Sequence, residues 1–117
     1  MEKKKFDLLE RTMKFAYELR RLLQELNPND ISSEDRKQLL RSSGSVGANY
    51  VEANESISKK DFVLRIRICK KEAMESMYWL ELIKRTGDSN KREYIEKFIQ
   101  EAKELGRIFG AIINKCQ

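Results

Sequence analysis

Four stretches of the chain carry apolar residues at the alternating three- and four-residue steps that place side chains on one face of an α-helix. The first runs from about Phe6 to Leu26, and Asn27 ends it, because the following Pro28 disfavours helix in the residue before it. Its apolar face comprises Leu8, Phe15, Leu19, Leu22 and Leu26, widened by Leu9, Ala16 and Leu23. This pattern predicts an amphipathic helix.

The second stretch begins at Ser32 or Ser33, where Ser32 and Asp35 have the spacing of a capping box. Its apolar seam is Leu39, Ser43, Val46, Tyr50, Ala53 and Ile57. Gly44 and Gly47 lie within this range, although glycine costs about 1 kcal/mol in a helix interior relative to alanine. Two alternatives follow: another backbone approaches closely at the glycines, or the helix kinks or breaks near Gly44.

The third stretch opens at Ser58, with Asp61 at the capping position, and Gly87 is its expected end. Residues 88–90 lead into the fourth, for which Asn90 and Glu93 form a candidate capping pair. The two seams are Phe62, Ile66, Cys69, Ala73, Met77, Leu80 and Ile83, then Ile95, Phe98, Ala102, Leu105, Phe109 and Ile112. Four helices with short connections predict an all-α fold, an antiparallel up-down-up-down four-helix bundle, as a single domain over residues 1–117.

Further apolar residues lie off the seams of the second and third stretches. They are Val51, Val63, Leu64, Ile68, Met74, Tyr78, Trp79 and Leu82. A helix that is apolar around much of its girth needs a second partner. In a chain of 117 residues, self-association is the natural way to cover this surface, so we expect a homo-oligomer.

The composition agrees with long helices that have wide solvated faces. Hydrophobic residues make up 40% and charged residues 37%, with one Pro and five Gly, which argues against the frequent turns of a β-sandwich. No stretch approaches the about 18 apolar residues of a membrane span, and the basic start lacks the apolar run of a signal peptide. Cys69 and Cys116 match no metal spacing and fall at apolar helical positions, as expected for buried thiols in a reducing cytoplasm.

The side chains needed for common catalytic sites are missing. The chain has no His, which removes Ser–His and Cys–His pairs and the Glu-x-x-His motifs of di-iron bundles. Residues 44–47 resemble part of a phosphate loop but lack its preceding strand and its Gly-Lys-Ser/Thr ending. Glu52, Glu55, Glu72 and Glu75 leave an all-carboxylate metal site as an alternative, although helical carboxylates are far more often solvated. We therefore predict no catalytic residue, cofactor or metal.

Residues 42–49 place small and polar side chains where leucine is expected in mid-helix. Asn49 and Glu52 share one helical face, and if buried they need hydrogen-bond partners, for which Arg41, Ser45 and Lys71 are candidates. We interpret Arg41, Ser45, Asn49 and Glu52 as a structural polar network that fixes helix register. A ligand site is the alternative.

Basic residues concentrate at the start of the third predicted helix. They are Lys59, Lys60, Arg65, Arg67, Lys70 and Lys71, with Asp61 the only acid among them. The net charge of +5 is a mild excess that permits nucleic-acid binding without demanding it. In one chain these residues are an ordinary charged surface, but a ring of subunits would repeat them and create a basic surface for a phosphate backbone.

A set of ordered motifs spans nearly the whole chain. They are Glu10-Arg11-Thr12, Lys14-Phe15-Ala16, Gln38-Leu39-Leu40-Arg41-Ser42, Ser45-Val46-Gly47-Ala48-Asn49-Tyr50, Glu52-Ala53, Ser58-Lys59-Lys60-Asp61-Phe62, Lys71-Glu72-Ala73 and Tyr78-Trp79-Leu80-Glu81-Leu82. Together they resemble the bacterial four-helix-bundle family of 23S rRNA-intervening sequence proteins. The resemblance implies a homopentameric ring of four-helix bundles with no known catalytic activity. A related branch, the accessory variability determinant of diversity-generating retroelements, is a basic pentamer that works with a reverse transcriptase and RNA.

These observations lead to three hypotheses. The first is a cytoplasmic, non-enzymatic homo-oligomer, most simply a pentamer, that binds RNA through basic ring surfaces, with a reverse transcriptase or other protein as a further partner and no membrane contact. The second is a protein-interaction scaffold that binds no nucleic acid. The third is a metal-dependent enzyme that uses the glutamate cluster. Salt-dependent RNA binding separates the first two, and metal analysis tests the third.

Overall fold

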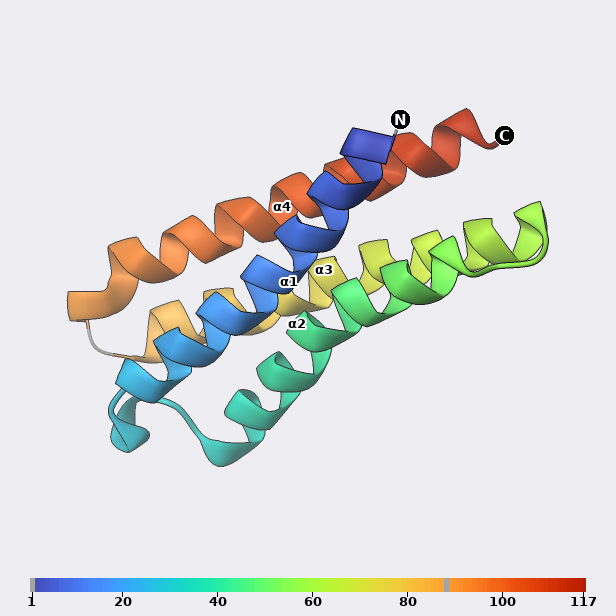
Figure 1. Ribbon diagram of the computed structural model, residues 1–117. Coiled ribbons are helices and arrows are strands. Elements are labelled where there is room, and N and C mark those ends of the chain that lie inside the picture. The colour runs from blue at the N-terminus through green and yellow to red at the C-terminus, as the bar shows by residue number, and fades with distance from the viewer. Residues whose placement is uncertain (1, 88) are drawn as a thin grey trace.

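The chain forms four long helices that pack side by side. The computed structural model describes the backbone of residues 2–87 and 89–117 and the side chains of residues 8–87 and 90–117. Consecutive helices run in opposite directions, so both ends of the chain lie at one end of the bundle (Figure 1). The predicted all-α, up-down-up-down bundle is confirmed. Within the described residues its elements are α1 (Glu2–Glu25), η1 (Pro28–Asp30), α2 (Ser33–Asn54), α3 (Lys59–Thr86), η2 (Ser89–Lys91) and α4 (Arg92–Lys115), where η marks a short 3-10 helix.

Capping side chains set the start of two helices where the sequence predicts them. The Ser32 hydroxyl accepts a hydrogen bond of 3.0 Å from the Asp35 amide at the start of α2, and the Ser58 hydroxyl accepts one of 3.1 Å from Asp61 at the start of α3. Each bond satisfies one of the amides that a helix leaves unpaired in its first turn. Gly87 follows the end of α3, also as predicted.

Three boundaries differ from the prediction. α2 ends at Asn54, so Ile57, which the sequence places in its apolar seam, lies beyond the helix and is fully exposed. α4 begins at Arg92 with Lys91 as its N-cap, and no side chain forms a capping hydrogen bond there, so Asn90 is not the cap. The 3-10 helix η2 accounts for the shift, because it occupies the residues that the capping pair would need. Asp88 lies outside the described residues. α1 begins at Glu2, ahead of Phe6, whose side chain is also outside them.

Side-chain size decides how closely the helices approach one another. α3 packs closely along both α2 and α4, whereas α1 comes close to α2 over a shorter length and to α4 over a shorter length still. The α2–α3 seam contains the buried Ser42 and Ser76, and α4 presents the buried Ala102 and Gly106. The large buried side chains of α1, such as Phe15 and Leu19, hold that helix further away. In Figure 1, α1 crosses its neighbours obliquely.

The two glycines of α2 face α1 inside a continuous helix, so the kink that the sequence left open is not observed. A Cβ atom added to Gly47 would lie 3.0 Å from Thr12 Oγ1, and one added to Gly44 would lie 3.2 Å from Arg20 Nη2. Thr12 is buried, and its hydroxyl donates a hydrogen bond of 3.0 Å to the Leu9 carbonyl. Close approach of another backbone is therefore confirmed at Gly47, where the added Cβ would lie 3.7 Å from the backbone carbon of Thr12, whereas Gly44 meets only the end of the Arg20 side chain.

Replacing the two glycines by alanine should have opposite effects. Gly47→Ala should lower the free energy of unfolding by about 1 kcal/mol or more, because the new methyl group pushes against the buried Thr12. Gly44→Ala should raise it by about 0.5–1 kcal/mol, because the exposed end of Arg20 can move aside and alanine favours helix. Urea denaturation of both variants measures the difference, and equal effects would contradict this account of the α1–α2 contact.

Candidate nucleic-acid interface

The basic residues of α3 lie mainly on its solvent-exposed side. Five of the six are exposed: Lys59, Lys60, Arg67, Lys70 and Lys71. Within the described part of the chain, none of these five forms a hydrogen bond or an ion pair with another side chain. Their ammonium and guanidinium groups are therefore available to an external anion.

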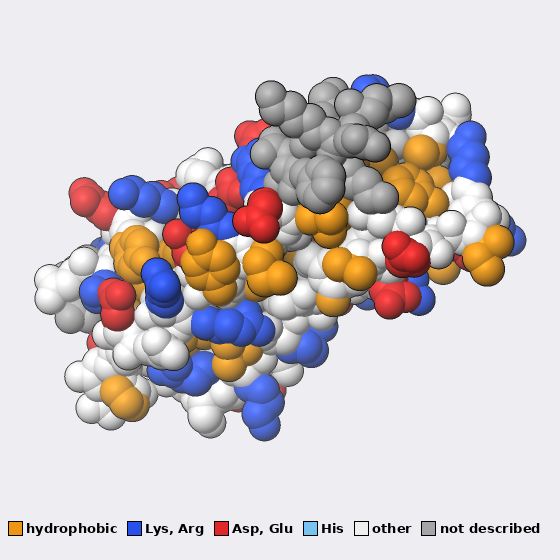
Figure 2. All heavy atoms as spheres, viewed as in Figure 1, with side chains coloured by type: hydrophobic (Ala, Val, Ile, Leu, Met, Phe, Trp, Pro, Cys, Tyr) orange, Lys and Arg blue, Asp and Glu red, His pale blue; other side chains and the backbone are white. Residues whose placement is uncertain are grey.

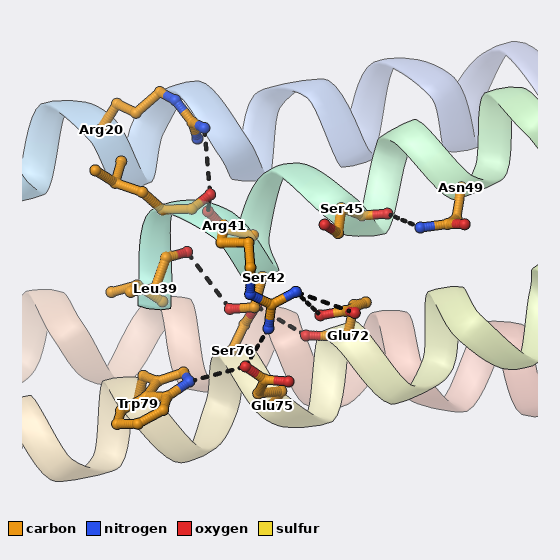
Figure 3. Close-up of polar contacts among 12 residues, drawn as sticks. Arg20, Leu39, Arg41, Ser42, Ser45, Asn49, Glu72, Glu75, Ser76 and Trp79 are labelled. Atoms are coloured by element: carbon orange, nitrogen blue, oxygen red, sulfur yellow. Dashed lines mark hydrogen bonds and ion pairs between the residues drawn. The ribbon is translucent and has the colours of Figure 1, made fainter. Parts of the chain in front are cut away.

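Arg65 differs from the other five because it bonds to α2. Its Nη1 donates to Asn49 Oδ1 at 3.1 Å, and its Nη2 lies 4.0 Å from Glu52 Oε1. Asn49 Nδ2 in turn donates to the Ser45 carbonyl at 2.9 Å (Figure 3). Arg65 thus links the two helices. Glu52 is 63% exposed, so it lies at the solvent end of this link and does not form part of a buried network.

Arg41 forms a second cluster with α3, separate from the Asn49 group. Its Nη1 lies 3.2 Å from Glu72 Oε1 and 3.3 Å from Oε2, and its Nη2 donates to Glu75. The Trp79 indole donates a hydrogen bond of 3.1 Å to the same Glu75 carboxylate. In Figure 3 the guanidinium of Arg41 points across to both carboxylates. The structure therefore divides the four predicted network residues between two clusters.

A pair of serines lies beneath the Arg41 cluster. Ser76 Oγ is 2.9 Å from both Ser42 Oγ and the backbone oxygen of Glu72, and both serines are buried. Their small side chains let α2 and α3 approach closely while the hydroxyls remain hydrogen-bonded. Ser42 belongs to the polar segment singled out in the sequence, whereas Ser76 was missed. A small polar residue within the apolar seam of the third stretch was the available signal.

The acidic residues and cysteines offer little for catalysis. Arg41 pairs with both Glu72 and Glu75, while Glu52 and Glu55 are exposed on α2. Among the residues that the structure describes, no three His, Cys, Asp or Glu side chains are grouped so that they could hold a metal ion. Burial raises the pKa of Cys69 to about 12, which leaves its thiol protonated and a poor nucleophile at neutral pH.

No helix in the described ranges is long and apolar enough to span a membrane.

Trp79, the chain's single tryptophan, should report the protonation of Glu75. Burial alone would raise the pKa of Glu75, but hydrogen bonds from Trp79 and Arg41 outweigh it and lower the pKa below its ordinary 4.5. The pairing therefore contributes stability above the unfolded-state pKa and is lost as the pH falls through the folded-state value. We expect a step in Trp79 emission with a midpoint below pH 4.5.

The control for this titration is Glu75→Gln, which should abolish the step, and far-ultraviolet circular dichroism separates it from global unfolding. Arg41→Gln should move the midpoint to higher pH, because one of the groups that lower the pKa is gone. A step that persists unchanged in Glu75→Gln would contradict the assignment.

Comparison with known proteins places this geometry in context. The family model described as 23S rRNA-intervening sequence protein matches residues 4–111. A crystal structure from Bacteroides thetaiotaomicron, of a protein with unknown function from the S23 ribosomal protein family, has 34% sequence identity and a TM-score of 0.84. This alignment covers 95% of the present chain and 98% of that one. The search of curated proteins gave no match.

Proposed function

The chain belongs to the family of 23S rRNA-intervening sequence proteins, and from that premise we propose that it is a non-enzymatic, cytoplasmic homopentamer that binds RNA through the basic residues of α3. The proposal extends beyond the family assignment in three respects: the RNA ligand, the assembly and the surface used. Each has separate support and a separate test.

The observation that carries the RNA proposal is the set of exposed cations on α3 that lack partners. These are Lys59, Lys60, Arg67, Lys70 and Lys71, because Arg65 is engaged with Asn49. Lys59 and Lys60 lie in the first turn of α3, where positive charge opposes the helix dipole, so helix stability does not explain them. Binding of an external polyanion would explain why both positions carry lysine. In a ring the set recurs around the symmetry axis, and weak contacts add up through multivalency.

Assembly is supported by apolar side chains that the subunit leaves exposed. Val51 is 50%, Leu64 55% and Tyr78 61% exposed, on α2 and α3 as the sequence predicts for a homo-oligomer. Met13 and Tyr17 of α1 are exposed as well. A cyclic ring joins two different surfaces of neighbouring subunits, so separate apolar sets on different helices suit it. The number five rests on the family resemblance.

The direct test is fluorescence anisotropy with a labelled RNA hairpin over a salt series. Each phosphate contact contributes about 0.7–0.9 to the slope of log affinity against log salt. Five contacts from one subunit therefore give a slope of about −4, and neighbouring subunits steepen it. Contacts from lysine and arginine to phosphates carry no sequence information, so we expect little sequence preference. No binding at low salt would overturn the RNA proposal.

The exposed apolar residues favour one alternative, a scaffold that binds a partner protein and no nucleic acid. Figure 2 shows hydrophobic side chains in a broken row along α1, between charged residues. A surface of this kind can serve a partner protein as well as a second copy of the chain. If the pentamer forms but RNA does not bind at low salt, this alternative replaces the first.

A further inference from the structure

We propose that an RNA strand lies in the groove between α3 and α4, with its phosphodiester backbone held between the α3 cations and a second row, Lys103 and Arg107, on α4. This inference rests on the proposed RNA binding and names the surface that receives the strand. None of the sequence motifs singled out Lys103 or Arg107.

The groove follows the α3–α4 boundary as two adjoining hollows. They share Lys70 and Met74 of α3 and Gly110 and Asn114 of α4, and the end of the Lys70 side chain lies over Gly110 where they meet. Gly110 has no side chain to narrow the groove, and a Cβ atom added there would lie 3.6 Å from Lys70 Nζ. Met74 packs over Gly106, where an added Cβ atom would lie 2.5 Å from Met74 Cε. The floor is therefore apolar and shallow.

The charged side chains of the described residues that line this groove all have one sign. Arg67, Lys70 and Lys71 line it from α3, and Lys103 and Arg107 line it from α4. Among the described residues, neither hollow is lined by an Asp or Glu. Glu104 lies outside the lining and pairs with Arg107 at 3.5 Å, but Arg107 remains 70% exposed, and a surface pair of this kind is weak.

The groove between α1 and α4 provides an internal contrast. It is similar in size to each of the two α3–α4 hollows, but Glu10, Glu18 and Glu101 line it together with Arg11, Lys14 and Lys97. Arg11 and Glu101 also form a two-bond ion pair, with distances of 2.7 and 2.9 Å. Its charges thus balance, and a polyanion gains little there. Of these two grooves, only the one between α3 and α4 combines a concave shape with an excess of positive charge.

The type of contact follows from the lining. No aromatic side chain among the described residues lines either α3–α4 hollow, so these residues offer bases no ring on which to stack. The cations stand on both sides of an apolar floor, which suits a ribose-phosphate strand that passes between them. We therefore expect the groove to hold the backbone of single-stranded and hairpin RNA alike and to read no sequence.

The test reverses the charge of the α4 row alone. Lys103→Glu/Arg107→Glu should weaken binding of a labelled RNA hairpin about tenfold at low salt and flatten the salt slope by about 1.4–1.8, the share of two phosphate contacts. Lys14→Glu/Lys97→Glu makes the same change in net charge in the α1–α4 groove and should have little effect. Sedimentation of each variant checks that the assembly is unchanged, and Lys103→Gln/Arg107→Gln replaces the first variant if that one fails to fold.

The outcomes separate this inference from the proposal beneath it. If the α4 variant binds like its matched control while reversal of Arg67 and Lys71 abolishes binding, RNA contacts the α3 cations without reaching the α4 row, and the inference is overturned while the proposed function stands. If the parent protein binds no RNA, both fall. Loss of binding in the α4 variant with retention in the control supports the groove.

Discussion

A protein carrying Arg67→Glu/Lys71→Glu should bind RNA at least about tenfold more weakly than the parent at low salt, with a salt slope flatter by about 1.4–1.8. Both side chains are exposed, and among the described residues neither forms a hydrogen bond or an ion pair, although Lys71 lies near enough to Glu75 to lower its pKa. The two new carboxylates also repel the phosphates of the RNA, an effect that neutral substitutions would not have. Anisotropy with an RNA hairpin measures the affinity, and the salt series counts the lost contacts.

The matched control for this variant is Lys37→Glu/Arg92→Glu. It makes the same change in net charge at exposed residues outside α3. Because exposed charges further apart than about 10 Å are largely screened at moderate salt, the control should retain most of the affinity. Equal losses in the two variants would mean that only the net charge matters. Because Leu64 lies one turn from Arg67 on α3, sedimentation of the variant checks that the mass of the parent is retained.

The second large effect concerns mass. Sedimentation equilibrium at micromolar concentration should give roughly 69 kDa, five times the 13.8 kDa of one chain. The physical reason is the exposed apolar surface on α2 and α3. Removing apolar surface from water lowers the free energy by about 25 cal/mol per Å². A mass of one chain would overturn the assembly proposal, and with it the argument that the basic residues recur around an axis.

A single charge should disrupt this assembly if the apolar part of α3 lies in the interface. Leu64 is 55% exposed, and Leu64→Glu would place a carboxylate where a neighbouring subunit must cover it. We expect the mass to fall towards that of one chain. Gln24→Glu, at an exposed polar position of α1, adds the same charge and should leave the assembly intact.

Much of the fold follows from local sequence signals. The apolar seams place the four helices, and Ser32 and Ser58 cap two of them as predicted, because a cap depends on residues within one turn. The predicted start of α4 was wrong because another local element forms there. Asn90 and Glu93 have acceptable spacing, but the 3-10 helix over Ser89–Lys91 takes up the same residues.

The contacts of the candidate site depend on which helices pack against each other. The periodicity of residues within one helix does not predict that pairing. Arg41 shares a face with Ser45 and Glu52, yet its partner is Glu72, 31 positions away on α3. For the same reason Arg65 counts as one of six cations in the sequence, although in the fold it bonds to Asn49.

The close packing of α3 against α2 and α4, and the looser seating of α1, have a consequence for amide hydrogen exchange. Backbone amides exchange through openings that release the least well-packed unit first. α1 should be that unit, so its amides should exchange at lower protection than those of α3 while the other three helices remain folded. The cations proposed to hold RNA lie on α3 and α4, and they would keep their positions during such an opening.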